Sequence, residues 1–117
     1  MKTNIKLLLF SVSICIVTIG SAQNVIRFYA GGKVGYKNKL SGEIVVQPIY
    51  SAGSEMMADN TALVIEGRKR GFINEKGEVI IPFIYDDASV FFDGLARVMK
   101  DGKHGYINVK NETVIPF

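Results

Sequence analysis

The chain has 117 residues, of which 14 are Lys or Arg, 11 are Asp or Glu, one is His and one is Cys. That length suits one small domain, and a formal net charge of +3 argues against a nucleic-acid binder, which usually carries a strong basic excess on one face. A single cysteine excludes a disulfide framework within the chain and a zinc site built from several cysteines.

Residues 1–22 are predicted to be a secretory signal peptide rather than part of the fold. They carry Lys2 and Lys6 near their start, continue with a mainly apolar run over residues 7–19, and end on the small residues 20–22. The run is too short for an ordinary membrane span, and an uncleaved membrane anchor is the alternative. We therefore expect a mature chain that begins at Gln23, exported to the periplasm or to the cell surface or extracellular space, with no membrane span.

Removal of this segment changes the composition of the mature chain. Cys15 is lost with it, and lipidation of Cys15 is a weaker alternative because the preceding residue, Ile14, is not small. Lys2 and Lys6 are lost as well, so 12 of the 14 basic residues remain against 11 acidic ones, a net charge of +1. The mature chain then has no thiol, so packing has to supply the stability of the exported domain.

A repeat of about 34 residues organises the rest of the chain. The stretches GFINEKGEVIIPF (residues 71–83) and GYINVKNETVIPF (residues 105–117) match at eight of thirteen positions, and Pro48, Pro82 and Pro116 are spaced by 34 and 34 residues. A period of this length is the signature of a repeat architecture.

The repeats are placed at about residues 33–68, 69–102 and, as a partial copy, 103–117, within a β-repeat domain that covers residues 23–117. The first copy is looser than the others when the copies are aligned on their prolines. One extra residue falls before Gly42 and lengthens a turn. A second falls after Gly42, and we expect it to form a β-bulge in the following strand.

Each copy is predicted to be an antiparallel β-meander, which makes the protein all-β. In the clearest copy, residues 95–99 form a strand, Asp101-Gly102 is a strong hairpin-turn signal, and residues 105–108 return as the second strand. Residues 113–115 form a third strand. We expect consecutive meanders to stack, because some strands are apolar on both faces and a single small sheet cannot bury both.

Three other stretches carry local predictions. Gly77 and Asn111 occupy equivalent places in the second turn, and both tolerate positive φ, so this turn position is expected to be left-handed. The segment Ser51–Asn60 is open to a helical turn. The basic cluster Arg68–Arg70 lies at a predicted hairpin turn and is interpreted as a solvated loop rather than a phosphate-binding patch.

The polar residues form no catalytic, metal-binding or cofactor-binding constellation. His104, the only histidine, is interpreted as a solvated residue beside a turn, because no further ligand or nucleophile accompanies it. Asp86 and Asp87 are adjacent, so in a strand their carboxylates point to opposite faces, and Asp86 is expected to pin a turn. Asp59 and Asp93 recur at one repeat position, which also indicates a turn role.

One aromatic residue recurs in each copy directly after a glycine: Tyr36, Phe72 and Tyr106. The recurrence favours a role as the large core residue of each repeat, and the alternative is a ladder of aromatic rings that stack on sugars.

These residues resemble the WG repeat family, also called KWG repeats. The resemblance extends over essentially the whole mature chain and implies an exported bacterial protein built from tandem β-repeats, a family in which most members have no assigned activity. The chain lacks the signature Trp, which Tyr36, Phe72 and Tyr106 replace, and it holds few copies. The pattern lies on Gly71-Phe72-Ile73-Asn74, Lys76-Gly77-Glu78, Ile81-Pro82, Tyr85-Asp86-Asp87-Ala88, Phe92-Asp93-Gly94-Leu95-Ala96-Arg97-Val98 and Lys103-His104-Gly105-Tyr106.

We therefore expect a non-catalytic, exported module that binds a protein or a component of the cell envelope through its repeat-built surface. A glycan-binding or cell-wall-binding module is the first alternative, motivated by the recurrent aromatic residues. A truncated piece of a longer array is the second, motivated by the partial third copy. The identity of the binding residues stays open.

Overall fold

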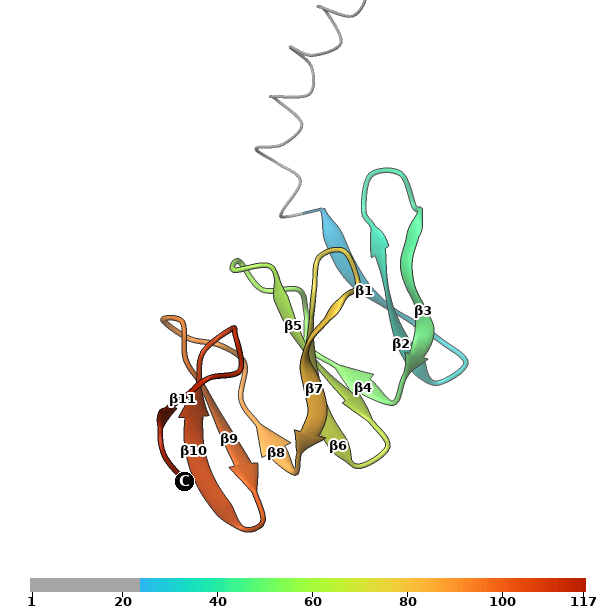
Figure 1. Ribbon diagram of the computed structural model, residues 1–117. Coiled ribbons are helices and arrows are strands. Elements are labelled where there is room, and N and C mark those ends of the chain that lie inside the picture. The colour runs from blue at the N-terminus through green and yellow to red at the C-terminus, as the bar shows by residue number, and fades with distance from the viewer. Residues whose placement is uncertain (1–23) are drawn as a thin grey trace, which may run out of the picture.

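The computed structural model describes residues 24–117, which fold into three antiparallel sheets arranged in chain order (Figure 1). The first sheet contains β1 (Val25–Ala30), β2 (Lys33–Asn38) and β3 (Ile44–Tyr50). The second contains β4 (Ala52–Gly53), β5 (Thr61–Glu66), β6 (Lys69–Asn74) and β7 (Val79–Tyr85). The third contains β8 (Asp87–Ala88), β9 (Ala96–Lys100), β10 (Lys103–Ile107) and β11 (Thr113–Ile115).

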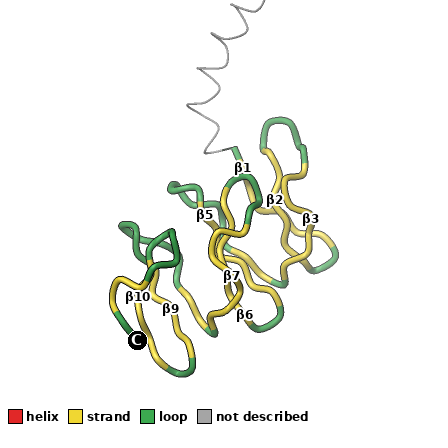
Figure 2. The backbone as a smooth tube through the Cα atoms, viewed as in Figure 1, coloured by secondary structure: helices red, strands yellow, loops and turns green. Residues whose placement is uncertain are grey.

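This part of the chain is all-β, as predicted, and consists of strands and loops without a helix (Figure 2). The segment Ser51–Asn60 forms β4 and an irregular loop, so the helical turn considered there is wrong. The predicted signal peptide, residues 1–22, and Cys15 lie outside the described residues.

The sheets begin at a different point of the repeat than the boundaries predicted from the sequence. Each predicted boundary coincides with the second strand of a hairpin, β2, β6 or β10, whereas each sheet also includes the strand before it. In the first sheet that strand is β1, which the predicted repeats left out. One residue, Ser51 or Asp86, joins the last strand of a sheet to the first strand of the next.

The turns follow the local sequence closely. Asp101 and Gly102 both have positive φ, 52° and 79°, as the hairpin prediction requires for a type I′ turn. Gly77 and Asn111 have φ of 83° and 63°, so the left-handed turn position is confirmed. This second turn is held by an asparagine: the side-chain oxygen of Asn74 accepts hydrogen bonds from the backbone N–H groups of Lys76 and Glu78, at 2.9 and 3.0 Å.

The last strand of each of the first two sheets, β3 or β7, carries the same register shift, which corrects the alignment on proline. Tyr36 pairs with Val46 and Phe72 with Ile81, and the pairing is irregular on both sides of each pair. The strands β3 and β7 have identical patterns of exposure when Tyr50 is matched with Tyr85, which places Gln47 rather than Pro48 opposite Pro82 in the alignment.

The expectation that an extra residue creates a bulge in the first copy is therefore wrong, because both copies have the irregularity. The surplus residue lies instead in the loop before β5: Tyr50 to Ala62 is 12 steps (62 − 50), whereas Tyr85 to Ala96 is 11 (96 − 85). Loops accept such insertions readily, while a one-residue slip in a strand would turn its buried side chains to the other face.

The irregular last strand of each sheet explains the glycine that precedes each recurrent aromatic residue. At Gly35 and Gly71, an added Cβ would lie 2.6 Å from the carbonyl oxygen of Val46 or Ile81 in the last strand of the sheet. At Gly105 the equivalent distance, to the carbonyl oxygen of Ile115, is 3.0 Å. Glycine is thus needed for the close approach of two backbones, while its neighbour carries the aromatic side chain into the core.

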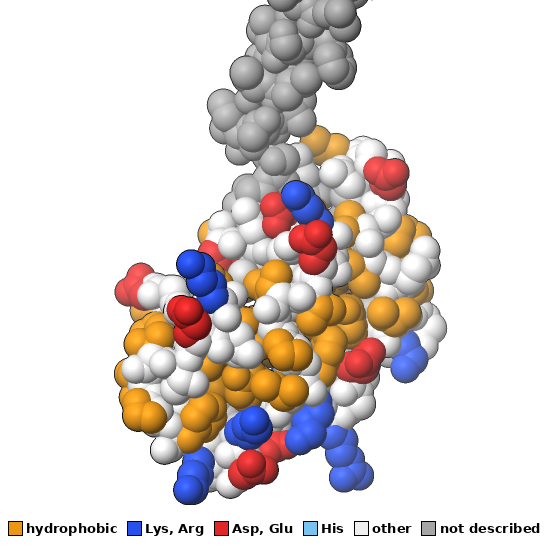
Figure 3. All heavy atoms as spheres, in the orientation of Figure 1, with side chains coloured by type: hydrophobic (Ala, Val, Ile, Leu, Met, Phe, Trp, Pro, Cys, Tyr) orange, Lys and Arg blue, Asp and Glu red, His pale blue; other side chains and the backbone are white. Residues whose placement is uncertain are grey.

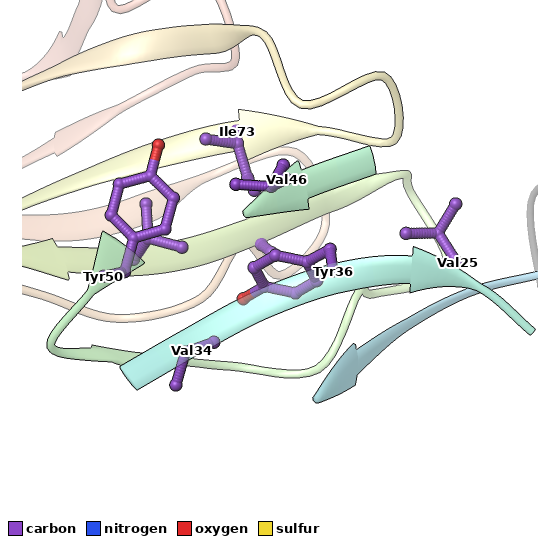
Figure 4. Packing of buried hydrophobic residues seen from close by; sticks show 8 residues of the cluster. Val25, Val34, Tyr36, Val46, Tyr50 and Ile73 are labelled. Atoms are coloured by element: carbon purple, nitrogen blue, oxygen red, sulfur yellow. The ribbon is translucent and has the colours of Figure 1, made fainter. Parts of the chain in front are cut away.

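The core lies between the sheets and not within any one of them. One cluster joins residues of the first and second sheets, and another joins residues of the second and third. Figure 4 shows Tyr36 of β2, Val46 of β3 and Ile73 of β6 converging on the first cluster. We call the two places where adjacent sheets pack together the first junction (first and second sheets) and the second junction (second and third sheets). The prediction that stacked meanders bury both faces of their strands is confirmed at these two junctions.

Repeat-equivalent isoleucines test the contribution of this stacking to stability. Ile81 pairs with Phe72 and is fully buried, whereas Ile115 pairs with Tyr106 and is 48% exposed. We expect Ile81→Val to lower the free energy of unfolding by about 1 kcal/mol, because it removes a buried methylene. Ile115→Val should lower it by less than about 0.5 kcal/mol. Urea melts followed by far-UV circular dichroism measure both values, and equal losses would contradict burial by stacking.

Candidate functional site

The acidic pair Asp86–Asp87 serves the structure through two separate sets of partners. The Asp86 carboxylate accepts hydrogen bonds from Lys69 and from the backbone N–H of Asp101, so it ties together two hairpin turns. The hydrogen bond from Lys69, with that from Asp101, lowers the pKa of Asp86 below its usual value. Asp87 instead lies 3.4 Å from Arg70 and accepts a hydrogen bond from the N–H of Ala88. The turn role predicted for Asp86 is confirmed.

The other acidic candidates are turn residues as well. Asp59 accepts hydrogen bonds from the backbone N–H of Thr61 at 3.1 Å and from its hydroxyl at 2.6 Å. Asp93 has a φ of 51° in the corresponding turn. The expectation for this repeat position is confirmed.

The basic candidates divide into exposed and paired residues. His104 is exposed on β10, next to the turn, as expected. Arg68 and Lys69 are exposed; Lys69 pairs with Asp86, the residue that joins the second and third sheets, and Arg70 donates to the Asp86 carbonyl oxygen at 2.7 Å. The cluster is solvated as predicted, since Arg68 and Lys69 are exposed, and two of its three cations also pair with Asp86 or Asp87.

Residues 24–117 contain no group of three or more His, Cys, Asp or Glu side chains placed to hold a metal ion. Over the same residues, no helix has the length and apolarity to cross a membrane.

Two of the three recurrent aromatic residues are buried, and the third is partly exposed. Tyr36 is fully buried, and its hydroxyl donates a hydrogen bond of 2.7 Å to the carbonyl oxygen of Ser54 in the next sheet. Phe72 is fully buried and packs on Phe91, in the loop between β8 and β9, with ring centroids 4.7 Å apart. The core role is confirmed for these two. Tyr106 is 36% exposed, because no later sheet among the described residues covers it.

Tyr106 borders an open hollow of about 430 Å³ on the third sheet. The hollow is lined by the loop between β8 and β9 and by two strand residues: Ser89, Val90, Phe92, Asp93, Leu95, Arg97 and Tyr106.

Further apolar side chains surround Tyr106 on this part of the molecule. Val114 and Ile115 are 50% and 48% exposed, and Phe92 is 79% exposed. We call the surface formed by Phe92, Tyr106, Val114 and Ile115 the end face. Figure 3 shows hydrophobic side chains gathered over the third sheet. In the first two sheets, the positions of Tyr106 and Ile115 are nearly or fully buried.

Arg27 is a further residue of interest, which the sequence pattern did not indicate. Arg27 of β1 lies directly opposite Tyr36, as Arg97 of β9 lies opposite Tyr106. Arg27 donates a hydrogen bond of 2.7 Å to the carbonyl oxygen of Gly53 and pairs with Glu55 at 2.8 Å. Arg27 precedes the predicted first repeat, so only the recognition of β1 as a strand of that repeat would have revealed it.

Comparison with known proteins identifies one family. The family described as WG containing repeat matches residues 35–69 and 71–103, which together make up more than half of the chain. No curated protein and no solved structure matches the chain.

The buried phenol of Tyr36 predicts a loss of stability at alkaline pH. Burial raises the pKa of Tyr36 above its ordinary value, so the unfolded chain releases this proton at a lower pH than the folded chain does. The contribution of Tyr36 to the free energy of unfolding is fully present below about pH 10, and it decreases as the pH rises further. We expect Tyr36→Phe to show a shallower fall between about pH 9 and about pH 11, measured by urea melts.

Loss of the hydrogen bond to Ser54 should also lower the stability of Tyr36→Phe at neutral pH by about 1 kcal/mol. Tyr29→Phe, which removes an exposed phenol, is the control for the number of tyrosines. If the free energy of unfolding of Tyr36→Phe fell with pH as steeply as that of the wild type, the alkaline loss of stability would not come from Tyr36.

Proposed function

Because the chain belongs to the WG containing repeat family, we propose that it is a non-catalytic, exported interaction module whose end face binds a partner protein at the cell envelope. The end face carries this proposal. Tyr106 is 36% exposed and Ile115 48% exposed, whereas Phe72 and Ile81 at the same repeat positions are fully buried. Contiguous exposed apolar side chains of this kind mark interaction surfaces.

The non-catalytic part of the proposal is supported by the roles that the candidate residues already have. Asp86 joins two turns, Asp87 faces Arg70, and Asp59 holds its own turn. His104 is exposed on a strand, beside a turn. A general base has to lie within hydrogen-bond reach of the group that it activates, which these placements do not provide.

The glycan-binding alternative loses much of its basis. It required Tyr36, Phe72 and Tyr106 to form an exposed ladder, but Tyr36 and Phe72 are fully buried. A single partly exposed ring, Tyr106, offers one stacking position and no series of them. The apolar surroundings of Tyr106 favour a protein partner instead.

Export is tested by the processing of the full chain in a bacterial host. We expect the periplasmic protein to begin at Gln23 in mass spectrometry, because Gly20 and Ala22 are the small residues that signal peptidase requires. Ala22→Leu should block cleavage, whereas Ser21→Leu, at the position between them, should leave it intact. Retention of the unprocessed wild-type chain in the membrane would contradict export of a cleaved protein.

The interaction proposal is tested by site-specific photo-crosslinking in the cell of origin. A photoreactive amino acid in place of Val114 should give a discrete protein adduct, because Val114 is 50% exposed on the end face. The same group in place of Leu40, which is 78% exposed in a turn of the first sheet, is the matched control. Equal adducts at both sites, or none at Val114, would contradict the proposal.

A further inference from the structure

The junction between the first two sheets shows how an Arg–Tyr pair holds an extended segment. Three consecutive residues at the end of β4 and in the loop after it are bound: Gly53 and Ser54 through their carbonyl oxygens, and Glu55 through its carboxylate. The Arg27 guanidinium donates to Gly53 at 2.7 Å and to Glu55 at 2.8 Å, and the Tyr36 hydroxyl donates to Ser54 at 2.7 Å. The next residue, Met56, packs against the buried cluster.

This junction also selects the size of the bound residue. A Cβ added to Gly53 would lie 2.6 Å from the Tyr36 hydroxyl oxygen, so the hydroxyl excludes a larger residue there. At the second junction, Phe72 has no hydroxyl, and Ala88 takes the position of Gly53. Tyr therefore accompanies Gly, and Phe accompanies Ala, in this chain.

The third sheet has the same Arg–Tyr pair, but there both side chains are exposed. Arg97 pairs with Tyr106 in the same register as Arg27 with Tyr36, whereas the second sheet has Leu63 opposite Phe72. Arg97 is exposed, and its guanidinium has no ion pair among residues 24–117.

The hollow beside this pair has the size for a large side chain. It measures about 430 Å³ and is walled by Val90, Phe92, Leu95 and Tyr106. At the second junction a large apolar side chain, Phe91, covers the equivalent aromatic residue. Asp93 also lines the hollow and disfavours an acidic side chain inside it, so an acidic residue of a bound segment belongs at Arg97.

We propose that the end face binds an extended segment of a partner protein with the order Gly, Ser or another small residue, an acidic residue, and a large apolar residue. Tyr106 and Arg97 bind two consecutive carbonyl oxygens, Arg97 binds the carboxylate, and the apolar side chain enters the hollow. The proposal rests on the interaction function above and names the chemistry of its partner. A second copy of this chain is not the expected occupant, because its own Gly53–Met56 segment is held by Arg27 and Tyr36.

The test uses a fluorescein-labelled peptide with the sequence YSAGSEMMA, that of residues 50–58, and the full chain purified after export. Fluorescence anisotropy should show saturable binding. Arg97→Met should weaken binding about tenfold or more, because it removes charge-assisted hydrogen bonds. A peptide with Gln in place of Glu55 should bind the wild-type chain more weakly, with little further loss against Arg97→Met.

A swap at the Tyr–Gly contact separates specific recognition from general apolar adhesion. A peptide with Ala in place of Gly53 should bind the wild-type chain about tenfold more weakly but should regain affinity for Tyr106→Phe, as Ala88 accompanies Phe72. Circular dichroism checks that each variant is folded.

Three results would overturn the proposal. The first is no binding to the folded wild-type chain at about millimolar peptide, and the second is binding that Arg97→Met does not weaken. The third is a peptide with Ala in place of Gly53 that regains no affinity for Tyr106→Phe. Self-association that is lost in Tyr106→Ser, without peptide binding, would also overturn it in favour of a second copy. If the photo-adduct at Val114 persists while the peptide does not bind, the interaction function stands and only the chemistry of the segment falls.

Discussion

The structure depends on one constraint: a sheet of three or four short strands cannot bury its own apolar side chains, so each sheet needs the next one to cover it. Tyr36 is buried only because Ser54 and its neighbours lie across it, and Phe72 only because Phe91 does. Each junction combines apolar packing with a backbone crossover of one residue. The stability of such an array comes mainly from contacts between neighbours.

The two junctions meet the same constraint with different side chains. In the first, the turn at Gly77 approaches β3 so closely that an added Cβ would lie 2.7 Å from the Val46 side chain. In the second, Asn111 occupies the turn and accepts a 2.6 Å hydrogen bond from the hydroxyl of Tyr85. The local requirement for positive φ is identical, but the space left by the neighbouring sheet decides which residue type serves it.

The two ends of the array differ in a way that bears on function. In the first sheet, Lys37 takes the place of the buried Ile73 and Ile107, and its ammonium lies 5.3 Å from the centre of the Phe28 ring. A lysine stem can cover apolar surface while its charge stays in water. On the end face, Tyr106 and Ile115 are the same kinds of residue as in the core, whereas His104 takes the place of the buried Val34. The proposed contact with a partner is placed at the end face because two core positions, those of Tyr106 and Ile115, keep apolar residues there.

The sequence by itself determined the all-β class, the repeat of about 34 residues, the hairpin at Asp101-Gly102 and the left-handed position at Asn111, because these depend on backbone preferences of single residues and on spacing. It also predicted a core role for Tyr36, Phe72 and Tyr106, which is wrong for the partly exposed Tyr106. Only the tertiary structure decided that β1 belongs to the first sheet, that the first two copies align on Tyr50 and Tyr85 rather than on Pro48 and Pro82, and that Tyr106 is partly exposed. These properties depend on which side chains meet across a junction, and distant contacts leave no periodic trace in the chain.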